Sequence, residues 1–148
     1  MMEADIESRF RSAGLDVVGW FTGSGGPSVT EAFHKVVHID AEPVERIPRR
    51  AAGAAQRVDE AWRDHARRGD VLSDDRSFLV AVGMDHGWLR VRMTDDADVT
   101  ALVDPQGELL FIARSLSGHR VCAASAEGDE YWILEADFRE QGADGDAT

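Results

Sequence analysis

Apolar side chains recur with a helical period in the first half of the chain and with a strand period in the second half. The clearest helical pattern extends from about residue 47 to residue 68. Its apolar or small positions, three or four residues apart, are Val44, Ile47, Ala51, Ala54, Val58, Ala61, Trp62 and His65. Pro48 fits only in the first turn of a helix, and Gly69 is typical of the residue after the last turn. The spacing therefore predicts a long amphipathic helix over 47–68 that buries one stripe of side chains.

Two shorter elements are predicted before that helix. Ile6 and Phe10 lie four residues apart with Gly14 just beyond them, which predicts a short helix over 5–13. The apolar run over 15–21 predicts a strand in the interior of a sheet. A glycine-rich loop follows this strand.

Two interpretations of residues 29–39 remain open. Ser28 and Glu31 have the spacing of a capping box, which favours a helix that begins at residue 29. Val36 is followed by a second valine, and this β-branched pair favours a strand over 35–39. We favour a helix that passes into an extended segment.

From Phe78 onward the period of the apolar positions changes to two. Six strands are predicted, at 78–84, 88–93, 99–103, 109–114, 120–125 and 131–138, with short turns between them. Together the patterns predict an α+β domain over residues 1–139. In it, a curved antiparallel β-meander of about six strands, a half-barrel, packs against the N-terminal helices. Residues 140–148 show no apolar period, so we expect a disordered acidic tail there.

The strand predicted over 88–93 alternates most clearly. Its core-facing positions are Leu89, Val91 and Met93, and its opposite positions are Trp88, Arg90 and Arg92. This alternation predicts that one face of the sheet is covered and that the other is available. An exposed Trp88 beside arginines would resemble a binding hot spot. The competing interpretation is that the N-terminal segment covers this tryptophan.

The formal net charge of −12 is concentrated in the second half of the chain. Residues 69–148 carry 17 acidic and 6 basic side chains, a balance of −11. Such a surface repels a phosphate backbone, so it argues against nucleic-acid binding and favours a basic protein partner. Solubility alone is the competing explanation of these acids.

Cys122 is the only cysteine, and its apolar neighbours predict a buried, unreactive thiol. The chain therefore offers no internal disulfide and no cysteine-based zinc site. No window approaches 18 consecutive apolar residues, and the first residues are acidic where a secretory signal would be basic. We therefore expect a cytoplasmic protein that does not bind a membrane.

Motifs for catalysis or ligand binding are weak. The loop that contains Gly25 and Gly26 follows a predicted strand, as phosphate-binding loops do, but it lacks the Gly-Lys-Ser/Thr of a P-loop. His34 and His38 could share a helix face with Glu31, or a strand face, yet three convergent metal ligands are not evident. No serine has the Gly-x-Ser-x-Gly context of a nucleophile. We therefore predict neither a metal nor a cofactor.

Two classes of function remain open. The leading hypothesis is a non-enzymatic acidic protein, of the inhibitor, immunity or chaperone type, that caps a basic protein partner as a monomer or a homodimer. The residues expected to contact the partner are Trp88, Arg90, Arg92, Asp95, Asp96 and Asp98. The alternative is a small-molecule-binding or small catalytic domain with a pocket between the curved sheet and the helices. The residues expected at the mouth of that pocket are Gly25, Gly26, His34 and His38.

Overall fold

The computed structural model describes residues 2–21, 27–36, 42–69, 71–81, 87–102, 109–116 and 120–137. Its helices are α1 (Met2–Ser12), α2 (Val29–Val36) and α3 (Ala54–Arg68), with a short 3-10 helix, η1, at Val99–Ala101. Its strands are β1 (Asp16–Trp20), β2 (Glu45–Pro48), β3 (Ser77–Ala81), β4 (Trp88–Arg92), β5 (Leu110–Arg114), β6 (Arg120–Glu127) and β7 (Glu130–Asp137). The tail predicted at 140–148 lies outside the described residues.

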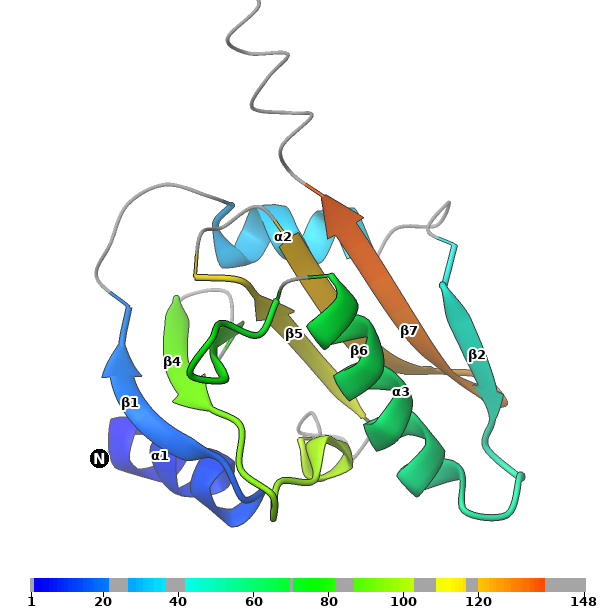
Figure 1. The fold of residues 1–148 in the computed structure, drawn as a ribbon. Helices are drawn as coiled ribbons and strands as arrows, with labels where there is room; N and C mark the ends of the chain where they lie inside the picture. The colour runs from blue at the N-terminus through cyan, green and yellow to red at the C-terminus, as the bar shows by residue number, and fades with distance from the viewer. Residues whose placement is uncertain are drawn as a thin grey trace, which may run out of the picture.

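The seven strands form one antiparallel sheet in the order β1-β4-β3-β5-β6-β7-β2 (Figure 1). Its two edges are β1 and β2, and the sheet curves without closing into a barrel. The prediction that the strand at 15–21 lies in the interior of the sheet is therefore wrong, because β1 is an edge strand whose residues are exposed or half-buried. The predicted α+β class with a curved antiparallel sheet is therefore confirmed. The simple meander holds only from β5 to β7, because β3 lies between β4 and β5.

Different helices cover the two faces of the sheet (Figure 1). α1, α3 and η1 pack on one face, where the larger cluster of buried side chains includes Phe10, Trp62 and Val99. α2 packs on the other face, where Val29 and Val36 belong to a second buried cluster. The expectation that this second face is available is therefore wrong over the area that α2 covers.

The capping box at the start of α2 is confirmed. Ser28 Oγ accepts a hydrogen bond from the backbone N–H of Glu31 (3.1 Å), and Glu31 Oε1 accepts one from the backbone N–H of Ser28 (2.9 Å). The helical interpretation is therefore confirmed as far as Val36. Residues 37–39 lie outside the described residues.

The predicted start of the long helix is wrong. Residues 45–48 form β2, which pairs with β7, and the helix begins at Ala54 after Gly53 has turned the chain with a φ of 68°. Ile47 is fully buried, as predicted, but it lies on strand β2 of the sheet and not on a helix. Pro48 ends an edge strand, which is a place where a sheet tolerates a residue without an N–H donor. From Ala54 to Trp62 the predicted buried stripe is confirmed, but His65 is half-buried and Ala66 is buried in its place.

The strand predicted over 99–103 is also wrong. Residues 99–101 form η1, and Asp98 caps it by accepting a hydrogen bond from the backbone N–H of Thr100 (3.0 Å). Val99 and Leu102 are both buried. Their spacing of three residues matches the turn of a 3-10 helix, whereas a strand would bury every second residue.

The hairpin predicted around Gly128 is confirmed. β6 and β7 pair along their whole length and leave Gly128 and Asp129 as a two-residue turn. Gly128 has a φ of 60°. Two-residue hairpin turns need a positive φ at their first central position, which glycine adopts without steric cost.

Candidate functional site

β4 points Arg90 and Arg92 to the same side of the sheet as Trp88, as the alternation predicted. Trp88, however, is only 6% exposed, so the expectation of an exposed tryptophan is wrong. Its indole N–H donates to the carbonyl oxygen of Pro27 (3.1 Å), immediately before α2. The N-terminal segment therefore covers Trp88, which belongs to the core and does not offer its ring to a partner.

A buried arginine beside Trp88 was not singled out from the sequence. Arg114, on β5, is 2% exposed, and its guanidinium lies 5.0 Å from the ring centroid of Phe21 and 5.6 Å from that of Trp88. Its Nη1 donates to the carbonyl oxygen of Pro27 (3.2 Å). Burial lowers the pKa of this guanidinium, because removal from water disfavours the charged form. These contacts fix Phe21 and Pro27 on the sheet.

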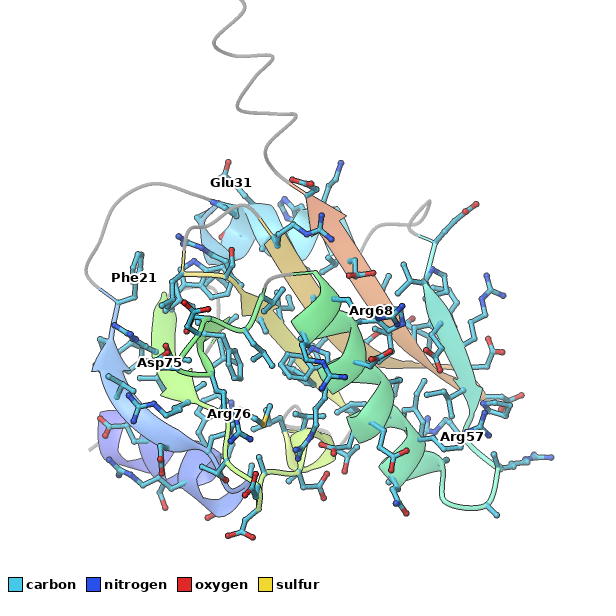
Figure 2. All side chains as sticks on the ribbon, in the orientation of Figure 1. Phe21, Glu31, Arg57, Arg68, Asp75 and Arg76 are labelled. Atoms are coloured by element: carbon cyan, nitrogen blue, oxygen red, sulfur yellow. The ribbon has the colours of Figure 1, made fainter. Side chains whose placement is uncertain are left out.

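Asp75 lies in the loop before β3 (Figure 2), and its carboxylate contacts the two arginines of β4. Asp75 Oδ1 accepts hydrogen bonds from Ser73 Oγ (2.5 Å), Ser77 Oγ (2.5 Å) and the backbone N–H of Ser77 (3.1 Å). Asp75 Oδ2 lies 3.5 Å from Arg92 Nη2 and 3.7 Å from Arg90 Nη2. The arginines predicted to contact a partner are therefore already engaged within the chain. The sequence signal for this arrangement was the spacing of Ser73, Asp75 and Ser77 around a turn.

The hydrogen bonds from Ser73, and then those from Ser77, lower the pKa of Asp75 well below its ordinary value of 3.8, and the charge of Arg92 adds to the shift. A carboxyl group with a lowered native pKa stabilises the fold above the pKa of the unfolded chain and loses that contribution as the pH falls. We therefore expect Asp75→Asn to destabilise the protein at pH 7, and to differ progressively less from wild type as the pH falls below 3.8. Urea unfolding between pH 7 and pH 3 measures both effects.

Asp74 provides the matched control for this prediction, because it is an exposed carboxylate in the same turn. We expect Asp74→Asn to leave the pH dependence of unfolding close to that of wild type. If Asp75→Asn showed the same difference from wild type at pH 7 and at pH 3, the ionised carboxylate of Asp75 would not be the stabilising group.

Three of the predicted contact residues, Asp95, Asp96 and Asp98, follow β4 and are all exposed. They are named here the acidic segment. Asp95 Oδ1 lies 3.2 Å from Arg76 Nη2, but the Asp95 side chain is 94% exposed, so this ion pair contributes little. Asp98 caps η1 with one carboxylate oxygen. The acidic segment therefore presents negative charge to solvent.

Three hydrogen bonds hold the backbone around the acidic segment. The backbone N–H of Asp98 donates to the carbonyl oxygen of Ala13 (2.8 Å), and Thr94 Oγ1 donates to the carbonyl oxygen of Gly14. From α3, Arg63 Nη2 donates to the carbonyl oxygen of Ala97. Because the turn after α1 and a side chain of α3 both hold it, the acidic segment occupies a defined position on the surface.

A groove of about 660 Å³ opens beside the acidic segment, between the end of α1, the first half of β1 and residues 92–96. It is lined by Arg11, Gly14, Leu15, Asp16, Val17, Val18, Arg92, Thr94 and Asp96, and is named here the β1 groove. Two of the predicted contact residues, Arg92 and Asp96, therefore meet in one site. Three further predicted contact residues lie near the groove. The half-buried Arg90 is two positions from Arg92 on β4, and the exposed Asp95 and Asp98 are close to Asp96 in the chain.

The residues predicted for the alternative pocket do not meet in the described part of the chain. His34 is exposed on α2, on the opposite face of the sheet from α3. Gly25, Gly26 and His38 lie outside the described residues.

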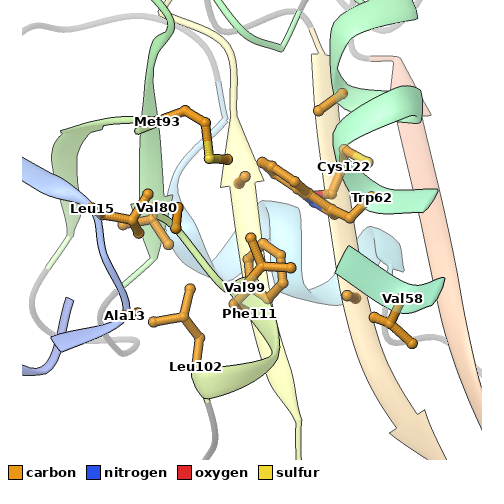
Figure 3. Packing of buried hydrophobic residues seen from close by; sticks show 14 of the residues in the cluster. Ala13, Leu15, Val58, Trp62, Val80, Met93, Val99, Leu102, Phe111 and Cys122 are labelled. Carbon is orange, nitrogen blue, oxygen red and sulfur yellow. The ribbon is translucent and has the colours of Figure 1, made fainter. Parts of the chain in front are cut away.

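Core side chains fill the space between α3 and the sheet (Figure 3). The Trp62 ring lies 5.4 Å from the Phe78 ring and 5.1 Å from the Phe111 ring, measured between centroids. Its indole N–H donates to the carbonyl oxygen of Cys122 (3.0 Å). Cys122 is fully buried there, and burial raises the pKa of its thiol, so the predicted unreactive character is supported.

A second polar cluster, at the end of α3, ties this helix to the sheet. His65 Nε2 lies 3.1 Å from Glu45 Oε1 on β2, and His65 Nδ1 lies 3.4 Å from Glu135 Oε2 on β7. Arg120 joins the cluster through Glu135 (3.8 Å) and Asp137 (3.1 Å). Each member has a charged or polar neighbour from another element, as a structural ion-pair network does.

Within the described residues, no three side chains among His, Cys, Asp and Glu are grouped so as to hold a metal ion. None of the helices in this part of the chain has the length and apolar character needed to cross a membrane. No family model matches the chain, and comparisons with curated proteins and with solved structures found no significant match. Function is therefore inferred from the fold and from the chemistry of the surface.

Proposed function

We propose that this protein is a non-enzymatic acidic binding protein that caps a basic region of a protein partner. The distribution of charge is the observation that carries the proposal. The chain has 28 acidic and 16 basic side chains. Among the described residues, the arginines that contact a carboxylate of the same chain include Arg11, Arg63, Arg67, Arg68, Arg76, Arg90, Arg92 and Arg120. The excess of charge is therefore carried by carboxylates, many of them exposed.

The acidic segment supports the proposal because it combines exposure with a fixed backbone. Asp95, Asp96 and Asp98 are exposed to solvent, while their loop is hydrogen-bonded to the turn after α1 and to α3. A binding surface that is ordered before association loses less conformational entropy on binding. Negative charge concentrated on it attracts a positively charged partner and raises the rate of association.

The alternative function, a pocket between the curved sheet and the helices, has less support. The interface between α3 and the sheet is occupied by buried side chains such as Trp62, Phe78 and Phe111. His34 points away from that interface, because α2 lies on the other face of the sheet. A binding surface on the outside of the molecule therefore fits the described structure better than an internal site.

Charge reversal tests the proposed function. The tagged protein is used to capture partners from a lysate of its own source, alongside Asp95→Lys/Asp96→Lys and the control Glu60→Lys/Asp129→Lys. Both variants change the net charge equally, and all four carboxylates are exposed. We expect wild type and control to recover the same basic protein in a stoichiometric amount, and the first variant to bind it at least about tenfold more weakly.

Two results would contradict the proposal. One is that the wild-type protein is recovered alone or only with acidic proteins. The other is that both double variants lose the partner equally, since net charge rather than the acidic segment would then govern binding. The affinity for the purified partner should also fall steeply with added salt, because salt screens attraction between exposed charges.

A further inference from the structure

The open edge of β1 is the least protected part of the sheet within the described residues. β1 pairs with β4 on one side, and no described strand pairs with its other side (Figure 1). The opposite edge, β2, is four residues long and ends in Pro48, which lacks an N–H donor. β1 contains neither a proline nor a lysine. The backbone groups of β1 are therefore the more available for pairing with another extended chain.

A β-bulge distorts β1, but no described strand pairs with its outer edge. The register between β1 and β4 shifts between Val17 and Gly19, so that Val18 falls at the bulge. Val18 is 48% exposed and is one of the two exposed large hydrophobic residues in the described chain. Bulges recur at sheet edges and beside functional sites, where they redirect a side chain. Here the bulge offers an apolar side chain at the wall of the β1 groove.

Two arginines and two aspartates line the β1 groove, and they differ in their ion pairs. Arg11 is paired with Glu7 (3.0 Å), and Arg92 lies 3.5 Å from Asp75. The carboxylates of Asp16 and Asp96 make no ion pair or hydrogen bond to another described residue. Within the described residues, the two arginines of the groove therefore have carboxylate neighbours outside its lining, whereas its two aspartates have no ion-pair partner.

We propose that the β1 groove binds an extended basic segment of the partner, which adds to the open edge of β1 and places a lysine or arginine side chain against Asp16 and Asp96. This inference rests on the proposed function and names where and how the partner docks. Strand addition supplies affinity through main-chain hydrogen bonds and specificity through the alternate side chains of the added strand. In such a segment, alternate basic and apolar side chains would meet the two carboxylates and Val18.

A synthetic peptide tests this docking site without the natural partner. The probe is a short blocked peptide in which valine alternates with lysine, titrated into the ¹⁵N-labelled full chain at low salt. We expect shifts in the amide resonances of residues 14–18 and 94–98. We expect Asp16→Asn/Asp96→Asn to weaken binding at least about tenfold. The matched control, Glu60→Gln/Asp129→Asn, removes the same charge from other exposed positions and should bind the peptide as wild type does.

A second peptide separates strand addition from charge attraction. It has the same side chains, but N-methylation of alternate residues blocks main-chain pairing, and we expect it to bind at least about tenfold more weakly. Equal binding of the two peptides, equal weakening by both double variants, or shifts confined to other regions would each overturn the inference. If the peptide fails while the captured partner still depends on the acidic segment, the docking site is wrong and the proposed function stands. If the peptide binds as expected while no basic partner is captured, the β1 groove is a binding site for extended basic peptides, but the proposed function is wrong.

Discussion

Replacement of Trp62 by alanine is expected to lower the free energy of unfolding by about 3–5 kcal/mol, which is a large share of the about 5–15 kcal/mol that stabilises a domain of this size. Trp62 is fully buried in the larger cluster, between the rings of Phe78 and Phe111. Loss of the indole leaves a cavity that its neighbours fill only in part. Urea unfolding followed by far-ultraviolet circular dichroism measures the change.

Two further variants separate the contributions of the indole. Trp62→Phe keeps most of the apolar surface but removes the N–H that donates to the carbonyl oxygen of Cys122 (3.0 Å), and we expect it to cost about 1–3 kcal/mol. Val18→Ala removes an apolar side chain that is 48% exposed, and we expect a change within about 0.5 kcal/mol. A Trp62→Ala variant as stable as Val18→Ala would show that α3 does not anchor the core through this ring.

The sequence was informative where a pattern depends on neighbours along the chain. The stripe from Ala54 to Trp62, the capping box at Ser28 and the glycine turn at Gly128 are local features, and each was confirmed. The start of α3 was not predictable in this way. Ile47 continues the spacing of the helical stripe, but it is buried because β2 pairs with β7, about 85 residues further along the chain.

The candidate site was predicted only in part, for a similar reason. Alternation along β4 correctly placed Arg90 and Arg92 away from the larger cluster, but it carries no information about what covers that face. Trp88 is buried because α2 and Pro27, some 60 residues earlier, lie over it. Likewise, Asp75 meets Arg92 only because β3 and β4 pair. These contacts depend on the tertiary fold, which no local period specifies.

The β1 groove contains one acid that the sequence pattern identified and one that only the tertiary fold brings to the site. Asp96 was among the residues that the sequence predicted to contact a partner. Asp16 was not singled out, because a lone acid at the start of a strand has no distinctive spacing. The two residues come together because α1 ends in a tight turn that carries the chain past the acidic segment. Gly14 makes that turn possible, so its replacement is expected to have a large effect on stability.

Replacement of Gly14 by alanine is expected to destabilise the protein by more than about 2 kcal/mol. Gly14 has a φ of 87°, where an L side chain is strained, and its N–H and that of Leu15 close the end of α1 through the carbonyl oxygens of Arg11 and Phe10 (2.9 and 3.2 Å). An added Cβ would also lie 2.5 Å from the carbonyl oxygen of Asp96. This neighbour is backbone and cannot rotate away. Thermal and urea unfolding measure the loss of stability.

Gly53→Ala is the matched control, because Gly53 also has a positive φ (68°) but has no heavy atom within 4 Å of the position of an added Cβ. Its cost should be the conformational strain alone, about 1–2 kcal/mol. The additional cost at Gly14 then measures the close approach of α1 to the acidic segment, and the amide resonances of Asp96 and Ala97 should shift only in the Gly14 variant. Equal costs at the two glycines would mean that the acidic segment moves aside freely. In that case the end of α1 would not fix the position of the acidic segment. The proposal that a basic partner binds a preordered surface would then lose one of its supporting observations.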